Sequence, residues 1–85
     1  MMEVSLTDVA EENLGELDSF VAKRIVNKLR WFAENFDSFA PQELAGRLKG
    51  FYKLRVGDWR VVYSVETGKS KIIVHFIDHR SRVYK

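Results

Sequence analysis

The fold is decided by the stretch between residues 51 and 66, which reads FYKLRVGDWRVVYSVE. Apolar and polar residues alternate on both sides of Gly57-Asp58, and a period of two is typical of strands whose side chains point to opposite faces. A Gly-Asp pair between two such runs is a two-residue turn signal. The stretch is therefore predicted to form a β-hairpin in which Val56 faces Trp59 and Arg55 faces Arg60.

This register separates the two faces of the hairpin. One face would carry the apolar set that receives the helices: Tyr52, Leu54, Val56, Trp59, Val61, Tyr63 and Val65. The other face would carry Lys53, Arg55 and Arg60. Arginines directly opposite each other repel by up to about 1 kcal/mol, and a bound phosphate would turn that repulsion into attraction. The alternative is that these cations simply discourage aggregation at a sheet edge.

The elements around the hairpin complete an α+β pattern. Residues 67–70 form a turn signal, Lys71 to Asp78 form a third strand, and a basic tail follows. Upstream, Ala40-Pro41 ends a helical pattern because proline disfavours helix in the residue before it.

The helical pattern itself begins at Ser19. Its apolar positions have the three-and-four spacing of a helix buried on one side, at Ala22, Ile25, Val26, Leu29, Phe32, Ala33 and Phe36. Its cations fall largely off that stripe and are interpreted as a solvated face: Lys23, Arg24, Lys28 and Arg30.

Before this helix, Val4 and Leu6 indicate a short N-terminal strand, and Thr7 or Asp8 can cap a first helix that runs to about Leu17. We predict an N-terminal strand and a helical hairpin packed on an antiparallel sheet of three or four strands, with residues 1–85 as one domain.

Composition sets the class of protein. Apolar residues make up 46% of the chain and charged residues 31%, as in folded globular domains, and the chain contains no cysteine. There is no apolar run of the roughly 18 residues that a membrane span needs, and the first residues lack the pattern of a signal peptide. The cytoplasm is the expected compartment.

Charge is unevenly distributed along the chain. Residues 1–46 hold four Lys/Arg and nine Asp/Glu, a formal charge of −5, whereas residues 47–85 hold ten and three, a formal charge of +7. The basic half is a candidate polyanion-binding surface. Alternatively, the two halves attract each other and the charges are only solvated.

Two motifs in the basic half resemble those of a known superfamily. The stretch 48–63, LKGFYKLRVGDWRVVY, and the ending 79–84, HRSRVY, are similar to the signature of RelE/ParE toxins. RelE-like members cut messenger RNA in the ribosomal decoding site, and ParE-like members poison DNA gyrase. The resemblance implies a RelE-like microbial RNase architecture, and the tail favours the RelE-like activity.

The resemblance also implies a set of catalytic residues. Lys53 and Arg55 match the paired basic positions of the family, Arg60 and Arg80 its two later arginines, and Tyr84 its near-terminal tyrosine. Arg55 stands where the best-studied pattern has lysine and is too basic to accept a proton. Proton transfer would then fall to Lys53 or Tyr84. Further phosphate contacts are expected from Arg47, Lys49, His79, Arg82 and Lys85.

Such a set could cleave RNA without a metal or cofactor. The 2′-hydroxyl is the nucleophile, so the enzyme has to remove its proton, stabilise charge on phosphorus and assist the leaving 5′-oxygen. Neighbouring cations would favour neutral Lys53, and Arg60 and Arg80 would hold the phosphate. His75, Asp78 and His79 do not have the arrangement of a metal site.

The resemblance implies partners as well. They are the ribosome with its message and a RelB-like antitoxin, whose complex with the toxin is expected to be a heterotetramer or larger; no membrane is involved. Two other functions remain open: a ParE-like gyrase inhibitor, and a basic RNA-binding module without catalysis.

Overall fold

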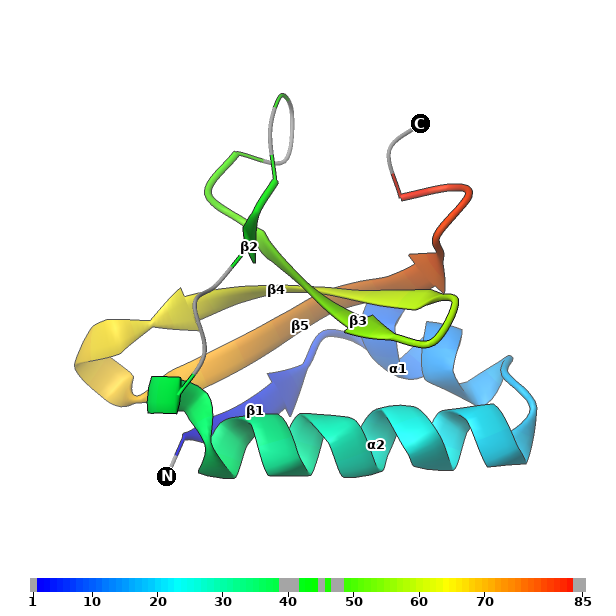
Figure 1. The fold of residues 1–85 in the computed structure, drawn as a ribbon, viewed down its shortest axis with the longest axis horizontal. Coiled ribbons are helices and arrows are strands. Elements are labelled where there is room, and N and C mark those ends of the chain that lie inside the picture. The colour runs from blue at the N-terminus through cyan, green and yellow to red at the C-terminus, as the bar shows by residue number, and fades with distance from the viewer. Residues whose placement is uncertain (1, 39–41, 45, 47–48, 84–85) are drawn as a thin grey trace.

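The computed structural model describes residues 2–38, 42–44, 46 and 49–83. Its elements in chain order are β1 (Glu3–Leu6), α1 (Asp8–Gly15), α2 (Ser19–Glu34), the 3-10 turn η1 (Phe36–Ser38), β2 (Gln42–Glu43), β3 (Tyr52–Val56), β4 (Trp59–Glu66), the 3-10 turn η3 (Thr67–Lys69) and β5 (Lys71–His79). Both helices lie on one side of the sheet (Figure 1). The predicted α+β class, with its N-terminal strand and helical hairpin, is confirmed.

The sheet has the strand order β1-β5-β4-β3-β2. The predicted meander β3-β4-β5 is antiparallel, but β1 runs parallel to β5, with Glu3 opposite Lys71. Parallel neighbours cannot be joined by a tight turn, and here the whole chain from α1 to β4 lies between β1 and β5. The sheet is therefore mixed, and the two-residue β2 adds a fifth strand that the sequence pattern did not predict.

The hairpin has the predicted register, with Val56 opposite Trp59 and Arg55 opposite Arg60. Gly57 has φ +60°, which favours glycine, while Asp58 keeps a negative φ. A positive φ at only the first central residue is the pattern of a type II′ turn, whose twist matches that of the flanking strands. The β4–β5 ladder is less regular and shifts register between Val62 and Tyr63.

Both helices begin at side-chain caps. The Thr7 hydroxyl accepts a hydrogen bond from the Ala10 N–H (3.1 Å), and the Asp18 carboxylate accepts one from the Phe20 N–H (2.9 Å). The second helix ends at Glu34, earlier than its apolar stripe predicted, because the chain tightens into η1. Phe36 still packs on the core from that turn, at 5.3 Å between its ring centroid and that of Phe32.

The main core lies between the helices and the sheet. Its largest fully buried side chains come from α2, β4 and β5: Tyr63, Phe32, Ile25, Ile72, Val61 and Val74. All the apolar residues that the hairpin register assigned to this face pack in this cluster. That part of the sequence prediction is correct in every position.

A second, smaller core covers the opposite face of the sheet. Val62 is fully buried there under Leu44, which follows β2, and Val83 from the C-terminal segment, with Phe51 and Phe76 alongside. The strand pattern did not anticipate it, because its covering residues are distant in sequence from β4. This second core fixes the C-terminal segment to the sheet. The chain therefore turns back over the sheet after β5, as it must if the tail residues are to join the predicted site.

In the part of the chain that the structure describes, neither helix is long and apolar enough to cross a membrane.

Candidate functional site

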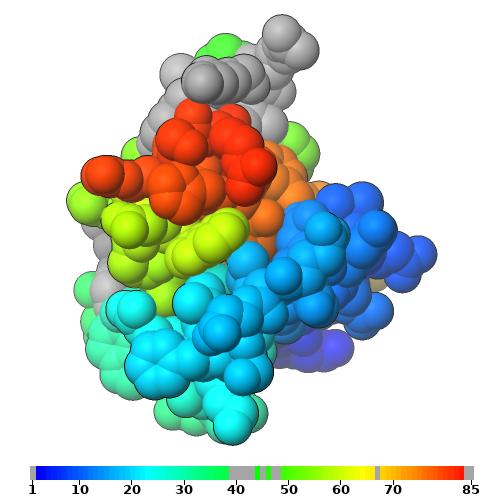
Figure 2. Space-filling model, turned by 90° about the vertical axis from the view of Figure 1, so that its right-hand side faces the viewer, coloured from blue at the N-terminus to red at the C-terminus, as the bar shows by residue number. Residues whose placement is uncertain are grey.

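The candidate site lies at one end of the sheet, where the β3–β4 turn meets the segment after β5. The backbone N–H of Arg80 donates to the carbonyl of Asp58 (2.8 Å), and the N–H of Arg82 donates to that of His79 (2.9 Å). The first bond brings the C-terminal segment against the hairpin turn, as Figure 2 shows from the end of the molecule, and the second turns the segment on itself. In the folded chain, Arg60 of β4 therefore lies in the same region as His79, Arg80 and Arg82.

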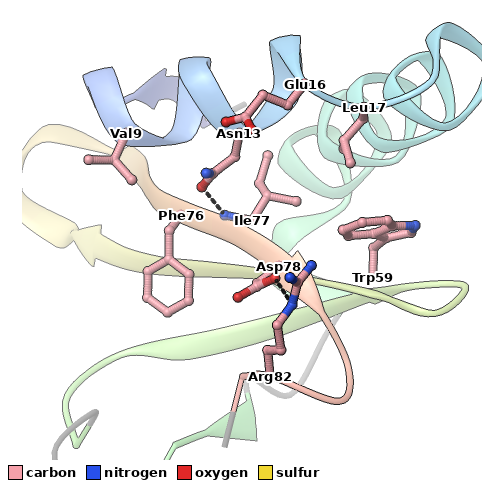
Figure 3. A pocket seen from close by; sticks show the side chains of 9 residues that line it. All are labelled: Val9, Asn13, Glu16, Leu17, Trp59, Phe76, Ile77, Asp78 and Arg82. Atoms are coloured by element: carbon pink, nitrogen blue, oxygen red, sulfur yellow. Dashed lines mark hydrogen bonds and ion pairs between the residues drawn. The ribbon is translucent and has the colours of Figure 1, made fainter. Parts of the chain in front are cut away.

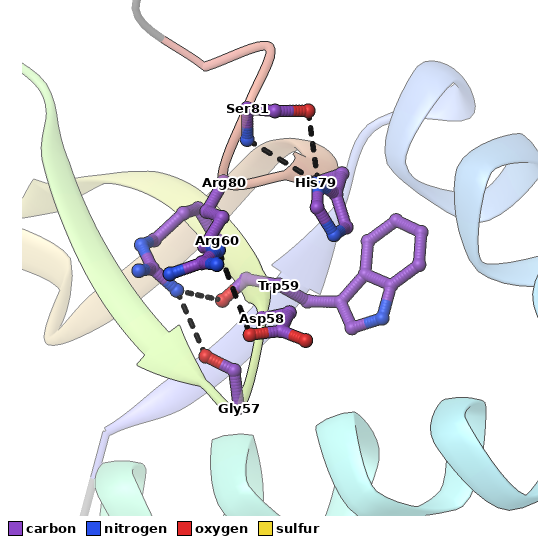
Figure 4. Close-up of polar contacts among 7 residues, drawn as sticks. All are labelled: Gly57, Asp58, Trp59, Arg60, His79, Arg80 and Ser81. Atoms are coloured by element: carbon purple, nitrogen blue, oxygen red, sulfur yellow. Dashed lines mark hydrogen bonds and ion pairs between the residues drawn. The ribbon is translucent and has the colours of Figure 1, made fainter.

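Arg60 is the one charged residue buried within the described chain, at 7% exposure. Its Nη1 donates to the carbonyls of Gly57 (3.0 Å) and Trp59 (2.9 Å), so its side chain curls back over its own turn (Figure 4). Carbonyl dipoles compensate a buried guanidinium, which cannot lose its proton. This arginine is held in place before any ligand binds.

Arg55 has a different environment although it faces Arg60 in the ladder. Its side chain is exposed, and it lines a hollow with Arg24, Asn27 and Lys28 of α2. The prediction that Arg55 and Arg60 form a paired phosphate site is therefore met only in register. The two guanidinium groups avoid mutual repulsion in different ways: Arg55 extends toward α2, and Arg60 curls over its own turn.

Arg80 and Arg82 each lie beside a carboxylate. The Nε of Arg80 is 3.6 Å from Oδ1 of Asp58, and both side chains are well exposed. The Nε of Arg82 is 2.9 Å from Oδ1 of Asp78, which is opposite Arg60 in the β4–β5 register. Exposed ion pairs contribute only about 0–1 kcal/mol, so a phosphate can compete for either arginine.

Asp58 and Asp78 were missed as members of the site. They are two of the three acidic residues in the basic half of the chain, and Asp78 is four residues before Arg82. The small number of acidic residues in the basic half was the signal by which the sequence could have identified these two aspartates. It could not show which cations the two carboxylates approach, because Asp58 reaches Arg80 only through the fold.

His79 is fixed by local contacts. Its ring lies edge-on to Trp59, with 5.4 Å between centroids, and the Ser81 N–H donates to its Nδ1 (3.3 Å). A nitrogen that accepts from a backbone N–H carries no proton, so the neutral ring is protonated at Nε2. The same Nδ1 is 2.9 Å from the Ser81 hydroxyl. These contacts give His79 a packing and hydrogen-bonding role, and its contact with phosphate stays a prediction.

The remaining predicted residues are distributed more widely. Lys53 is half-buried in the middle of β3, opposite Val62. Lys49 is exposed before β3, at the end of that strand farthest from the turn. Arg47, Tyr84 and Lys85 lie outside the described residues.

A pocket of about 570 Å³ opens beside the site, between α1 and the end of β5 (Figure 3). Its floor includes Trp59 and Ile77, and its rim includes Asp78 and Arg82. On the α1 side, the amide oxygen of Asn13 accepts a hydrogen bond from the Ile77 N–H (3.0 Å), which covers the sheet edge beyond the end of β1. No pattern in the sequence indicated that α1 would border the site.

Tyr63 lies on the helix-facing side of β4 and is 1% exposed. Burial, with a smaller effect of the neighbouring Tyr52 hydroxyl, raises the pKa of Tyr63 to about 12. Tyr63 therefore stays neutral at physiological pH and belongs to the core. Among the described residues, no three His, Asp or Glu side chains gather into a potential metal site.

The chain belongs to the RelE/ParE superfamily of toxins from type II toxin–antitoxin systems. The pattern of the family described as "ParE toxin of type II toxin-antitoxin system, parDE" matches residues 4–84. No curated protein sequence is detectably similar to the chain.

Solved structures share its fold. The toxin–antitoxin complex RelBE2 from Mycobacterium tuberculosis matches with a TM-score of 0.82 at 20% identity, over 93% of this chain and 98% of the other. The isolated Escherichia coli RelE toxin gives 0.76 at 23% identity, over 99% and 92%. A YoeB/ParE toxin from Agrobacterium tumefaciens gives 0.72 at 20% identity, over 92% and 98%.

Proposed function

We propose that this toxin is a metal-independent endoribonuclease that cleaves messenger RNA in the ribosomal A site. The observation that carries the proposal is the meeting of the C-terminal segment with the hairpin turn, which brings Arg80 and Arg82 to the end of the sheet that holds Arg60. Three arginines at the same end of the sheet suit a phosphate whose charge increases in the transition state.

The geometry supports a division of roles among the arginines. Arg60 is immobilised by two carbonyls and would provide a preorganised positive charge. Arg80 is held by the exposed Asp58 and Arg82 by the half-buried Asp78, and the two arginines would exchange these carboxylates for the scissile phosphate and its neighbour. The two aspartates would then keep the site ordered while it is empty.

Proton transfer is assigned to Lys53 and Tyr84, as the family pattern implies. Because neither a carboxylate nor His79 is assigned as the base, the site would be a weak catalyst, and alignment of the message by the ribosome would provide much of the barrier reduction. We expect poor cleavage of free RNA. Because ribosomes and their messages are in the cytoplasm, the proposed activity would take place there.

A cognate RelB-like antitoxin is the proposed partner, in a heterotetramer or a larger complex. Relatives with this fold have been solved as complexes with such proteins, in a RelE–RelB complex from Pyrococcus horikoshii and a heterotetrameric YoeB–YefM complex from Staphylococcus aureus. An acidic antitoxin segment with apolar anchors would complement the basic C-terminal half.

A gyrase inhibitor is the second candidate, and the match to the ParE family pattern favours it. Such a toxin would act by binding and would need none of the arginine chemistry at the candidate site. Purified protein would then block DNA supercoiling by gyrase in vitro, and Arg80→Ala would retain that activity.

The deciding experiment is primer extension on messages from cells that briefly express the toxin. We expect cuts at fixed positions within translated codons, at least about 100-fold fewer cuts with Arg80→Ala, and unchanged cutting with Arg30→Ala, a matched arginine loss on α2. Growth arrest with intact messages would overturn the nuclease proposal. A gyrase assay on the same proteins then distinguishes a ParE-like poison from a non-catalytic RNA-binding module.

A further inference from the structure

A hollow of about 410 Å³ lies between the outer side of α2 and the β3–β4 hairpin. Its lining from α2 is Arg24, Asn27, Lys28 and Trp31, and its lining from the hairpin is Arg55, Val56 and Gly57. We call this hollow the α2 groove. The hairpin separates it from the C-terminal segment, and Figure 2 shows the end of the hairpin between the start of α2 and that segment.

The α2 groove is positively charged, and no acidic residue is among the described residues that line it. Residues 19–33 contain four Lys/Arg and no Asp or Glu. Within the described chain, none of Arg24, Lys28 and Arg55 forms an ion pair with a carboxylate, in contrast to Arg80 and Arg82. Three cations without nearby counter-charges repel one another, and a polyanion would relieve that repulsion.

An exposed aromatic ring accompanies these cations. Trp31 is 44% exposed, which is unusual for so large an apolar side chain, and the Lys28 ammonium lies 4.3 Å from its ring centroid. A flat ring beside a cationic track is the combination that binds single-stranded nucleic acids, because bases stack on the ring while phosphates follow the cations.

The hairpin turn also positions one of the cations. A Cβ on Gly57 would lie 3.4 Å from Nη2 and 3.5 Å from Nη1 of Arg24, so the guanidinium packs directly against the turn backbone. The positive φ of the turn favours glycine at this position, whereas the approach of Arg24 is an ordinary van der Waals contact. The solvated-face interpretation of α2 does not explain why a cation should be packed in this way.

We propose that the α2 groove is a second RNA-binding surface, at which Arg24, Lys28 and Arg55 hold the sugar–phosphate backbone and Trp31 stacks on a base. This surface extends the proposed function, and it does not depend on catalysis because it concerns binding alone. It also gives Arg55, which cannot serve as a base, a role in positioning RNA.

The test is fluorescence anisotropy with a labelled oligouridylate of about twenty nucleotides, long enough to span several binding sites. Charge reversal in the groove by Arg24→Glu with Lys28→Glu should weaken binding at least tenfold and lower the salt dependence by roughly two phosphate contacts. The control is Lys23→Glu with Arg30→Glu, which makes the same charge change on the same helix outside the groove. Equal losses in the two double variants would overturn the proposal.

Trp31→Leu provides the second measurement. Loss of a stacking platform should weaken oligouridylate binding about fivefold or more and leave inorganic polyphosphate binding unchanged. Equal effects on both ligands, or no effect on either, would overturn the stacking role. Tighter groove-dependent binding of poly-L-glutamate than of RNA would assign the groove to an acidic protein instead. Circular dichroism melts confirm folding, and primer extension separately reports cleavage.

Discussion

The two faces of the sheet are built in opposite ways. The inner face is covered by α1 and α2 and buries a continuous cluster from almost every element. The outer face has only a small cluster around Val62, closed by Leu44 and Val83, and Lys53 lies opposite Val62 in the ladder. The inner face determines stability, while the outer face holds a functional segment in place with a few contacts. The second kind of face is the easier one for a partner to rearrange.

The largest effect should come from breaking the inner face. Phe32 is 2% exposed and packs edge-on to Tyr63, with 5.3 Å between ring centroids. Phe32→Ala should lower the free energy of unfolding by about 3–5 kcal/mol. Phe51→Ala, at the half-buried margin of the outer cluster, should cost less than half of that. Urea denaturation measures both, and equal losses would contradict the difference between the faces.

The next effect is a pH dependence confined to the inner face. Because the pKa of Tyr63 is raised from 10 to about 12, the folded state retains a proton that the unfolded state has lost between those values. The contribution of Tyr63 to the free energy of unfolding is fully present below pH 10, and it falls by roughly 2–3 kcal/mol as pH rises through 12.

Tyr63→Phe isolates this contribution from the other groups that titrate at high pH. Thermal unfolding of the two proteins at pH 9 and pH 12 should show a larger loss for the natural chain. A parallel decline in both proteins would contradict the burial argument.

Arg60 connects the outer face to the hairpin turn and should have an intermediate effect. Arg60→Ala removes the donor for two carbonyls and should cost about 1–3 kcal/mol. Arg55→Ala, the same change directly across the ladder at an exposed position, should cost less than about 0.5 kcal/mol. Chemical denaturation of the two variants measures both losses of unfolding free energy. Equal losses would refute our account of Arg60.

The smallest effect on stability should come from Asp78→Asn. The Arg82–Asp78 ion pair is partly exposed, so its loss should change the free energy of unfolding by less than about 1 kcal/mol. Removal of this carboxylate should nevertheless strengthen RNA binding severalfold, because Arg82 gains freedom to contact phosphate. Asp37→Asn, the same charge change in η1, is the control. Weaker RNA binding by Asp78→Asn would show that the aspartate orients Arg82.

Local sequence patterns determined much of this protein. The alternation around Gly57-Asp58 defined the hairpin register and the inner face, and helical spacing, with Thr7 as a cap of the first helix, defined the helices. These features depend on residues that are close in sequence, so a period of two or 3.6 is enough to predict them. The superfamily could be predicted for the same reason, since its motifs lie within short stretches.

Only the tertiary structure decided how identical residue types differ from one another. Arg55 and Arg60 share a rung of the ladder, yet one is exposed toward α2 and the other is buried over its own turn. The parallel pairing of β1 with β5, the contact of Asp58 with Arg80 and the closure of the outer face by Val83 all join distant segments. Such contacts follow from packing and charge balance in three dimensions, which no periodicity along the chain encodes.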